Sequence, residues 1–295
     1  MGITQFALVT LMASTTQILA APPADLKINY QFRSLSVCSG CATTAGGIND
    51  EGLVGASSPT QGYVLNVRTG MATPIQGALA VTVPGDNGVV PGITATSTGI
   101  VPLVRTSDGA IHVLPGFPGA TITAIVQFNL LATRSVGWAS ADFASFFSFE
   151  RSSAGDYRKL TYDGPVGDLT LGTFLLGVNT GGTMVGYLAN PAETETAGLI
   201  RHPNGTWERF SIQGSSSTVL YSINELGALA GGFKDSLGWH GFVWFQGWCQ
   251  KIDYPGAANT TLTGINNLGE LVGITFTTPS PLIGPTAAFH AVPFR

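Results

Sequence analysis

Charged side chains are scarce in this sequence: Asp, Glu, Lys and Arg make up 10% of its 295 residues. Globular domains usually contain about 25%. The 13 Lys and Arg residues form no basic cluster and are outnumbered by 17 Asp and Glu, which leaves a net charge of −4. A nucleic-acid partner is therefore not expected, because phosphate neutralisation requires basic residues. The 44% hydrophobic content excludes an intrinsically disordered chain.

Long hydrophobic runs are also absent, since no stretch reaches the roughly 20 apolar residues of a membrane helix. The apolar run at 7–13 is short and is followed by small residues at Ala20 and Ala21. This order predicts a secretory signal peptide over 1–21, although no Lys or Arg precedes the run. An ordinary N-terminal strand is the alternative. We therefore expect a secreted, extracellular protein with no membrane span.

Cysteine is rare, with residues at 38, 41 and 249 only. A zinc site needs about four ligands, and no second Cys or His pair has a matching spacing. In an oxidising compartment one disulfide and one spare thiol are the simplest interpretation. Cys38–Cys41 is the pairing we predict, while pairing of Cys38 with Cys249, free thiols and a redox pair remain alternatives. We expect neither a metal nor a cofactor.

Glycine, in contrast, is abundant, with 39 residues, and much of it belongs to an internal repeat. The pattern Gly-Ile-Asn-x-x-Gly-x-Val-Gly occurs at 47–55 and returns with small changes at 177–186, 222–231 and 264–273. Weaker copies at 92–101 and 128–137 complete a series spaced by about 45 residues. Asn and Gly favour the tight turn that follows each predicted strand, because both tolerate positive φ.

Each repeat contains four short apolar segments, and four strands in about 45 residues are typical of a β-propeller blade. We predict an all-β fold, a six-bladed β-propeller over 22–295 whose blades start near 47, 92, 128, 177, 222 and 264. Because the last repeat ends before a fourth strand, an N-terminal strand at Ser34–Val37 is expected to close it and cover the sheet edge. An open solenoid is the alternative, and a monomer is expected.

Two further motifs accompany the repeat: His240-Gly-Phe-Val-Trp244, and Ile252-Asp-Tyr-Pro-Gly-Ala257 after it. Together with the Gly-Ile-Asn pattern, they resemble the HAF-type extracellular repeat of bacterial and some fungal secreted proteins. The best matches are 222–257 and 264–292. This resemblance implies a secreted β-propeller, and it brings no general activity and no catalytic residue.

Side chains that could bind a ligand concentrate around the predicted strand at 240–245. Phe242, Trp244 and Phe245 alternate along it, as expected of a strand buried on both faces. Trp239 and Trp248 stand at its ends, and we expect this pair to be exposed and to stack on a sugar ring. Structural roles are expected for the repeat Asn residues and for four histidines: His112, His202, His240 and His290.

The most charged stretch falls where the repeat is weakest. Its carboxylates are Asp142, Glu150, Asp156, Asp163 and Asp168, with Arg151, Arg158 and Lys159 between them. A carboxylate pair there would supply general acid–base chemistry, and a solvated outer loop is the alternative interpretation.

Catalytic motifs are missing: no Gly-x-Ser-x-Gly, phosphate loop or His-Glu-x-x-His occurs. The catalytic residues are thus unknown, and we predict a secreted, non-catalytic β-propeller that binds an extracellular glycan or protein surface. A polysaccharide lyase or glycoside hydrolase with its site in the central funnel is the alternative, followed by a scaffold role.

Overall fold

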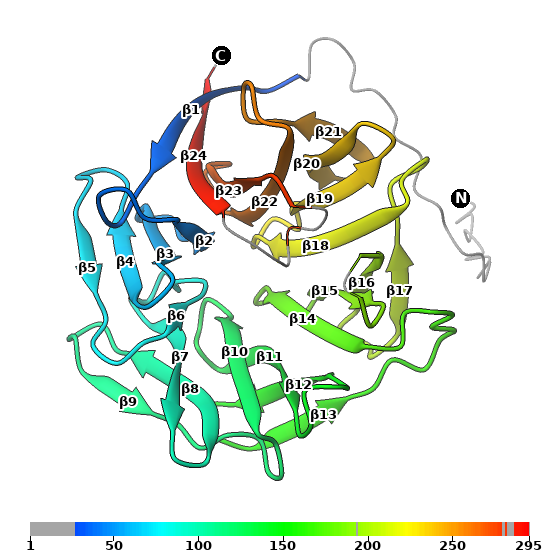
Figure 1. Ribbon diagram of the computed structural model, residues 1–295. Helices are drawn as coiled ribbons and strands as arrows, with labels where there is room; N and C mark the ends of the chain where they lie inside the picture. The colour runs from blue at the N-terminus through cyan, green and yellow to red at the C-terminus, as the bar shows by residue number, and fades with distance from the viewer. Residues whose placement is uncertain (1–26, 193, 279–280, 282–285, 295) are drawn as a thin grey trace, which may run out of the picture.

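The computed structural model describes residues 27–192, 194–278, 281 and 286–294, so the predicted signal peptide lies outside the described residues. These residues form 24 strands and no helix. None of this part of the chain could therefore cross a membrane as a helix. The sheets are arranged side by side around a common centre, with one strand of each nearest the middle (Figure 1). This all-β arrangement is that of a β-propeller.

Four of the sheets have four strands each. The first contains β2 (Thr44–Ile48), β3 (Leu53–Ser57), β4 (Gly62–Asn66) and β5 (Ala72–Pro74). Another contains β14 (Gly172–Val178), β15 (Met184–Ala189), β16 (Thr196–Arg201) and β17 (Trp207–Phe210). The next contains β18 (Ser217–Ile223), β19 (Leu229–Asp235), β20 (Gly238–Phe245) and β21 (Trp248–Ile252). Within each, consecutive strands pair antiparallel.

The fifth sheet has eight strands. It contains β6 (Ala80–Val81), β7 (Val90–Thr96), β8 (Gly99–Arg105), β9 (Ile111–Val113), β10 (Ile122–Phe128), β11 (Arg134–Ser140), β12 (Phe147–Ser152) and β13 (Tyr157–Leu160). The strands from β6 to β9 and those from β10 to β13 each pair antiparallel in succession. The two halves meet at one parallel pair, Ile122 with Ile100.

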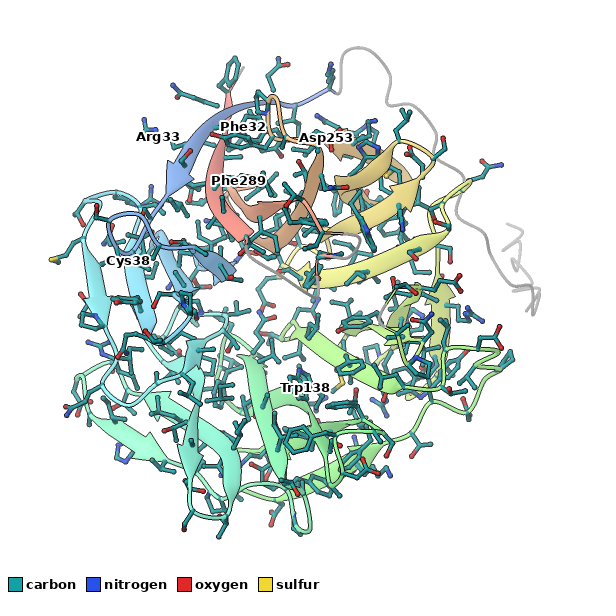
Figure 2. All side chains as sticks on the ribbon, viewed as in Figure 1. Phe32, Arg33, Cys38, Trp138, Asp253 and Phe289 are labelled. Atoms are coloured by element: carbon teal, nitrogen blue, oxygen red, sulfur yellow. A yellow bond between two sulfur atoms is a disulfide. The ribbon has the colours of Figure 1, made fainter. Side chains whose placement is uncertain are left out.

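The last sheet joins the two ends of the chain. It has the order β1–β24–β23–β22, with β1 (Asn29–Leu35), β22 (Asn259–Ile265), β23 (Leu271–Phe276) and β24 (Thr286–Phe294). The pairing of β1 and β24 is antiparallel from Asn29–Phe294 to Leu35–Ala288. Phe32 lies against Phe289, with ring centroids 5.7 Å apart (Figure 2). An N-terminal strand thus completes the last sheet as predicted, although it spans Asn29–Leu35 and not Ser34–Val37.

The last Gly of each repeat lies in the second strand of its sheet, where there is no room for a side chain. A Cβ on Gly231 would lie 2.0 Å from the Val219 carbonyl oxygen of the neighbouring strand. The ring of Phe242, one strand further out, would lie 3.0 Å from the same Cβ. Glycine here leaves room for the Phe ring, and the same close approach occurs between Gly273 and Phe289 in the last sheet.

The repeat Asn begins the turn after the innermost strand. In the first sheet, the Asn49 N–H donates to the Leu53 carbonyl at 3.0 Å and the Gly52 N–H donates to the Asn49 carbonyl at 3.1 Å. Gly52 has a φ of +77°, which glycine adopts without strain. The turns at 179–182, 224–227 and 266–269 have the same two hydrogen bonds.

The second copy of this turn lies at Gly85–Gly88, and not at 92–101 as the sequence analysis expected. Gly85 N–H donates to Val89 O at 2.8 Å and Gly88 N–H to Gly85 O at 3.0 Å, as in the other turns. Residues 92–101 instead belong to the hairpin of β7 and β8. The sequence pattern is lost because Gly85 replaces the Asn and the preceding strand, β6, has two residues.

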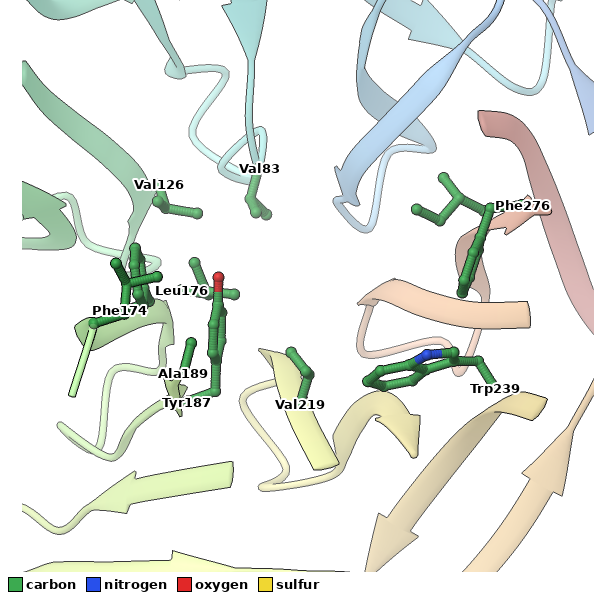
Figure 3. Close-up of a cluster of buried hydrophobic side chains, with 11 residues drawn as sticks. Val83, Val126, Phe174, Leu176, Tyr187, Ala189, Val219, Trp239 and Phe276 are labelled. Carbon is green, nitrogen blue, oxygen red and sulfur yellow. The ribbon is translucent and has the colours of Figure 1, made fainter. Parts of the chain in front are cut away.

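The centre of the ring is apolar. Five inner strands contain a β-bulge at the same place, and the bulge leaves one residue per strand out of register. Two of these residues, Val126 and Leu176, belong to a buried cluster with Val83 and Val219. Figure 3 shows these four side chains, three from strands and Val83 from the loop after β6, reaching toward the same central region. The central region is therefore part of the hydrophobic core.

Candidate functional site

A chain of hydrogen bonds between turns surrounds one end of the central region. The amide of Asn224 donates to the carbonyl of Asn266 at 3.1 Å, Asn266 donates to Asn49 at 3.0 Å, and Asn49 donates to Gly85 at 3.1 Å. Asn179 begins the chain with a 3.5 Å contact to the carbonyl of Asn224. The repeat Asn therefore links neighbouring sheets, and its recurrence reflects the fold.

The next residue of each turn forms a second chain. The backbone N–H of Asn267 donates to the Asp50 carboxylate at 2.7 Å, and that of Asp50 donates to the Asp86 carboxylate at 2.7 Å. Glu225 accepts from Thr180 N–H at 2.9 Å in the same way. Burial raises the pKa of Asp86, and repulsion from the neighbouring carboxylates adds to this. Asp50, Asp86 and Glu225 line a narrow opening at this end of the ring. Because each carboxylate already accepts a hydrogen bond from a backbone N–H, we assign them a structural role.

Two of the four histidines bond to carboxylates within their own sheet. His240 contacts Asp253 through Nδ1 at 2.9 Å and Asp235 through Nε2 at 3.2 Å. His202 contacts Glu208 at 3.0 Å. His290 is buried, which lowers its pKa. The described part of the chain contains no group of three or more His, Cys, Asp or Glu side chains arranged to hold a metal.

The charged stretch does not form one acidic site. Glu150 pairs with Arg134 at 2.7 Å and also with Arg158. Asp142 accepts the backbone N–H groups of Ser145 and Ala144, each at 2.9 Å, and these bonds lower its pKa. Most of these charged groups therefore bond to neighbours in their own stretch, whereas Asp168 lines a polar pocket that is described below.

The predicted pair of exposed tryptophans is not present. Trp239 is 2% exposed and packs in the central cluster, with its ring centroid 6.5 Å from that of Phe276. Trp248 is half-buried against the core of the last sheet. The expectation failed because Trp239 lies within β20, where its ring packs against Phe276 of the neighbouring sheet. Trp239 has no free face for a sugar.

The cysteines divide into a bonded pair and a buried thiol. Cys38 and Cys41 form a disulfide with Cα atoms 5.7 Å apart, in the loop between β1 and β2. Cys249 is 2% exposed, and burial raises the pKa of its thiol to about 12. Cys249 is therefore not poised for nucleophilic chemistry, because the thiolate is the reactive form.

A polar pocket of about 260 Å³ opens between the sheet of β14–β17 and the sheet of β18–β21. Its size lies just below the usual range for sites of drug-sized ligands, about 300–1,000 Å³. Three segments form its walls: 166–169 before β14, 195–197 at the start of β16, and 209–218 from β17 into β18. These segments connect strands, and in a rigid scaffold such connections are where binding residues concentrate.

Hydroxyl groups hold the pocket walls in place. Ser217 Oγ accepts the N–H of Thr196 at 3.2 Å, which ties β18 to β16 across the gap between sheets. Thr218 Oγ1 accepts the N–H of Ile212 at 3.2 Å, and Ser215 Oγ donates to the carbonyl of Ile212 at 2.7 Å. The turn before β18 is therefore fixed by its own side chains, and the pocket is preformed.

The pocket is lined by other polar groups, of which one is buried and the rest are exposed. Thr196 is 5% exposed, and its hydroxyl oxygen is buried without a hydrogen-bond partner. Asp168 and Glu195 are exposed, and neither carboxylate has an ion pair within the described residues. Arg209 donates through one Nη to the Pro165 carbonyl at 3.3 Å. The pocket thus presents hydroxyls, two carboxylates and a positioned guanidinium.

Comparison of the whole chain with known proteins adds a fold and no family. No protein-family model matches the sequence, and no curated protein sequence matches it. Virginiamycin B lyase from Staphylococcus aureus is similar over 90% of this chain and 99% of its own, with a TM-score of 0.51 and 11% identity. TolB from Acinetobacter baumannii has a TM-score of 0.55 and 11% identity over 87% of this chain and 66% of its own. A luciferin-regenerating enzyme has a TM-score of 0.53 and 10% identity, with 90% and 95% covered. The likeness shows the fold alone.

Sequence reasoning found Asp168 but not its neighbours in the pocket. Glu195 and Arg209 lie far from Asp168 in the sequence and carry no motif. The one available signal was the run Ser215-Ser-Ser-Thr218 directly before a repeat. Such a run is typical of any polar loop, so it did not distinguish this pocket from a solvated connection.

Proposed function

We propose that this protein is a secreted, non-catalytic β-propeller that binds an extracellular glycan in the polar pocket between β16 and β18. It is proposed to be a HAF-type repeat protein with six blades. The blade number follows if the eight-stranded sheet is two blades, because each half repeats the four-strand order and one parallel pair joins them. Secretion is supported by the apolar run at 7–13 and by the Cys38–Cys41 disulfide, since disulfides persist in oxidising compartments.

The observation that carries the glycan assignment is the chemistry of the pocket lining. Sugars offer many hydroxyls that both donate and accept, and recognition therefore needs acceptors and donors side by side. Asp168 and Glu195 supply acceptors, Arg209 supplies donors, and the serine and threonine hydroxyls supply both. An apolar ligand would leave these groups without partners, which disfavours it.

An enzyme that cleaves polysaccharides is the alternative, because two carboxylates line the same pocket. Glycoside hydrolysis uses one carboxyl as acid and a second as base or nucleophile. Asp168 and Glu195 are both exposed to solvent, whereas a carboxyl acting as the acid is kept protonated by an apolar environment. This exposure favours binding without turnover.

The proposal is tested with the mature protein on a glycan array, followed by calorimetry on each hit and chromatography of the sugar for released products. We expect binding without products. Arg209→Ala should weaken binding by roughly tenfold, because a hydrogen bond to a charged group contributes about 1.5 kcal/mol. Arg33→Ala, which removes an exposed arginine from β1, is the matched control and should bind normally.

Three results would overturn parts of this proposal. Failure to bind any glycan rejects the ligand class and favours a protein partner. Released products reject the non-catalytic role and direct attention to Asp168 and Glu195. Equal affinities for Arg209→Ala and the unchanged protein reject this pocket as the site, provided that both have the same circular dichroism spectrum.

A further inference from the structure

We propose that the pocket between β16 and β18 selects an amino sugar with a free ammonium group, such as a glucosamine oligomer. This inference rests on the proposed function and names the class of glycan. It follows from two separate properties of the pocket: the sign of its charge and the unsatisfied hydroxyl in its wall.

The charged side chains of the lining do not balance. The lining contains two carboxylates, Asp168 and Glu195, and one cation, Arg209, so the pocket has an excess of one negative charge when all three are ionised. The Arg209 guanidinium donates a hydrogen bond to the Pro165 carbonyl at 3.3 Å, so one of its donors is already used by the residue that precedes the lining segment 166–169. Within the described residues neither carboxylate is paired with a Lys, Arg or His. A cation on the ligand would therefore meet a carboxylate that has no competing partner.

The hydroxyl of Thr196 is the second observation, and it concerns the uncharged polar groups of the ligand. Its oxygen is buried and has no partner, although the backbone N–H of the same residue is bonded to Ser217 at 3.2 Å. Buried polar atoms are nearly always hydrogen-bonded, and exceptions call for an explanation such as a missing ligand. Because this oxygen is buried, a sugar hydroxyl or ammonium group would reach it only after the Thr196 side chain turns toward the pocket, which Thr196 lines together with the two free carboxylates.

An amino sugar combines the groups that these residues require. Its ammonium has three donors and one positive charge, which suits carboxylates that only accept. Its remaining hydroxyls suit the serine and threonine lining. The N-acetyl derivative keeps the hydroxyls but loses the charge, and a uronate carries a negative charge that the excess carboxylate repels. Amino sugars, N-acetylated sugars and uronates therefore differ in charge, and we expect their affinities for the pocket to fall in that order.

The test measures the affinities of four oligosaccharides of equal length by calorimetry: glucosamine, N-acetylglucosamine, glucose and galacturonate oligomers. We expect the glucosamine oligomer to bind three- to tenfold more tightly than the glucose oligomer, as exposed ion pairs provide modest gains. This advantage should shrink at 0.5 M salt, because exposed charges are screened. The galacturonate oligomer should bind most weakly.

Two variants connect the preference to the pocket. In Asp168→Asn/Glu195→Gln the ratio of the glucosamine affinity to the glucose affinity should fall to about one, whatever the change in glucose binding itself. Asp163→Asn is the matched control, because Asp163 is an exposed carboxylate of the same loop that does not line the pocket. Thr196→Val keeps the side-chain shape and should weaken every oligomer that binds. Its folded state should be at least as stable, since the lost hydroxyl had no partner.

The outcomes separate this inference from the proposed function. If glucose binds as tightly as glucosamine, and Arg209→Ala still weakens both, the pocket is a glycan site and the amino-sugar selectivity is wrong. If the advantage survives in the double variant, the selectivity does not come from these carboxylates and the inference is overturned. If none of the four oligosaccharides binds, this inference is overturned, and the glycan array decides separately whether the proposed function stands.

Discussion

The chain of Asn side chains between turns makes a quantitative prediction, which compares Asn224→Ala with Asn129→Ala. Asn224 is 7% exposed and forms three hydrogen bonds: to the Asn266 carbonyl at 3.1 Å, and from the N–H groups of Ala228 and Leu226 at 2.9 and 3.1 Å. Asn129 is 5% exposed, and its amide bonds only within its own turn: to the Thr133 hydroxyl at 3.1 Å, from Arg134 N–H at 3.1 Å, and through a long, weak contact from the Thr133 hydroxyl at 3.5 Å. The two variants thus differ mainly in the bond between sheets.

The expected losses in the free energy of unfolding follow from the number of hydrogen bonds that each substitution removes. At about 1 kcal/mol for each hydrogen bond, Asn224→Ala should lower the free energy of unfolding by about 3 kcal/mol and Asn129→Ala by about 2 kcal/mol. The Asn266 carbonyl keeps its bond from the Gly269 N–H at 3.2 Å in Asn224→Ala, so the expected difference between the two variants stays at about 1 kcal/mol. Urea denaturation followed by tryptophan fluorescence measures both values. Equal losses for the two variants would refute the idea that the chain of Asn side chains stabilises the contact between sheets.

Two further predictions concern single titratable groups. Because burial and neighbouring carboxylates raise the pKa of Asp86, its ionisation opposes folding above that pKa, and Asp86→Asn keeps an oxygen to accept the Asp50 N–H. The variant should therefore have a higher melting temperature at pH 7, by about 1 °C given solvent screening. This gain in melting temperature should vanish as the pH falls through the raised pKa of Asp86. A gain that does not change with pH would contradict the argument. The thiol assay should find no reactive thiol in the native protein, one after unfolding without reductant and three after reduction, because Cys249 is buried and Cys38 is bonded to Cys41; a native protein that reacts would show that Cys249 is accessible.

The repeats made much of the fold predictable from sequence. The Gly-Ile-Asn pattern located the innermost strand and its turn at Asn49, Asn179, Asn224 and Asn266, because those residues perform the same hydrogen bonding in each sheet. The copy at Gly85 was missed for a physical reason. Backbone hydrogen bonds alone can form that turn, so its side chain was free to change and the pattern disappeared.

The candidate site was much less predictable than the fold. Trp239 was expected on the surface because it stands at the end of an apolar segment, but β20 begins one residue earlier and the ring enters the core. The pocket depends on how two neighbouring sheets are spaced, and that spacing brings Asp168 near Arg209 across 40 residues of sequence. Periodicity describes each sheet separately and contains no information on the space between two of them.

The chain of Asn side chains runs from Asn179 through Asn224, Asn266 and Asn49 to Gly85. Within the described residues, the turn at 129–132 takes no part in it. That turn contains Leu130 and Leu131, which are 40% and 64% exposed. An insertion there would break no side-chain amide bond to a neighbouring turn, whereas the same insertion at 224–227 would break two. The mouth of the ring therefore has one position at which evolution, or a protein engineer, can lengthen a loop without disturbing its neighbours.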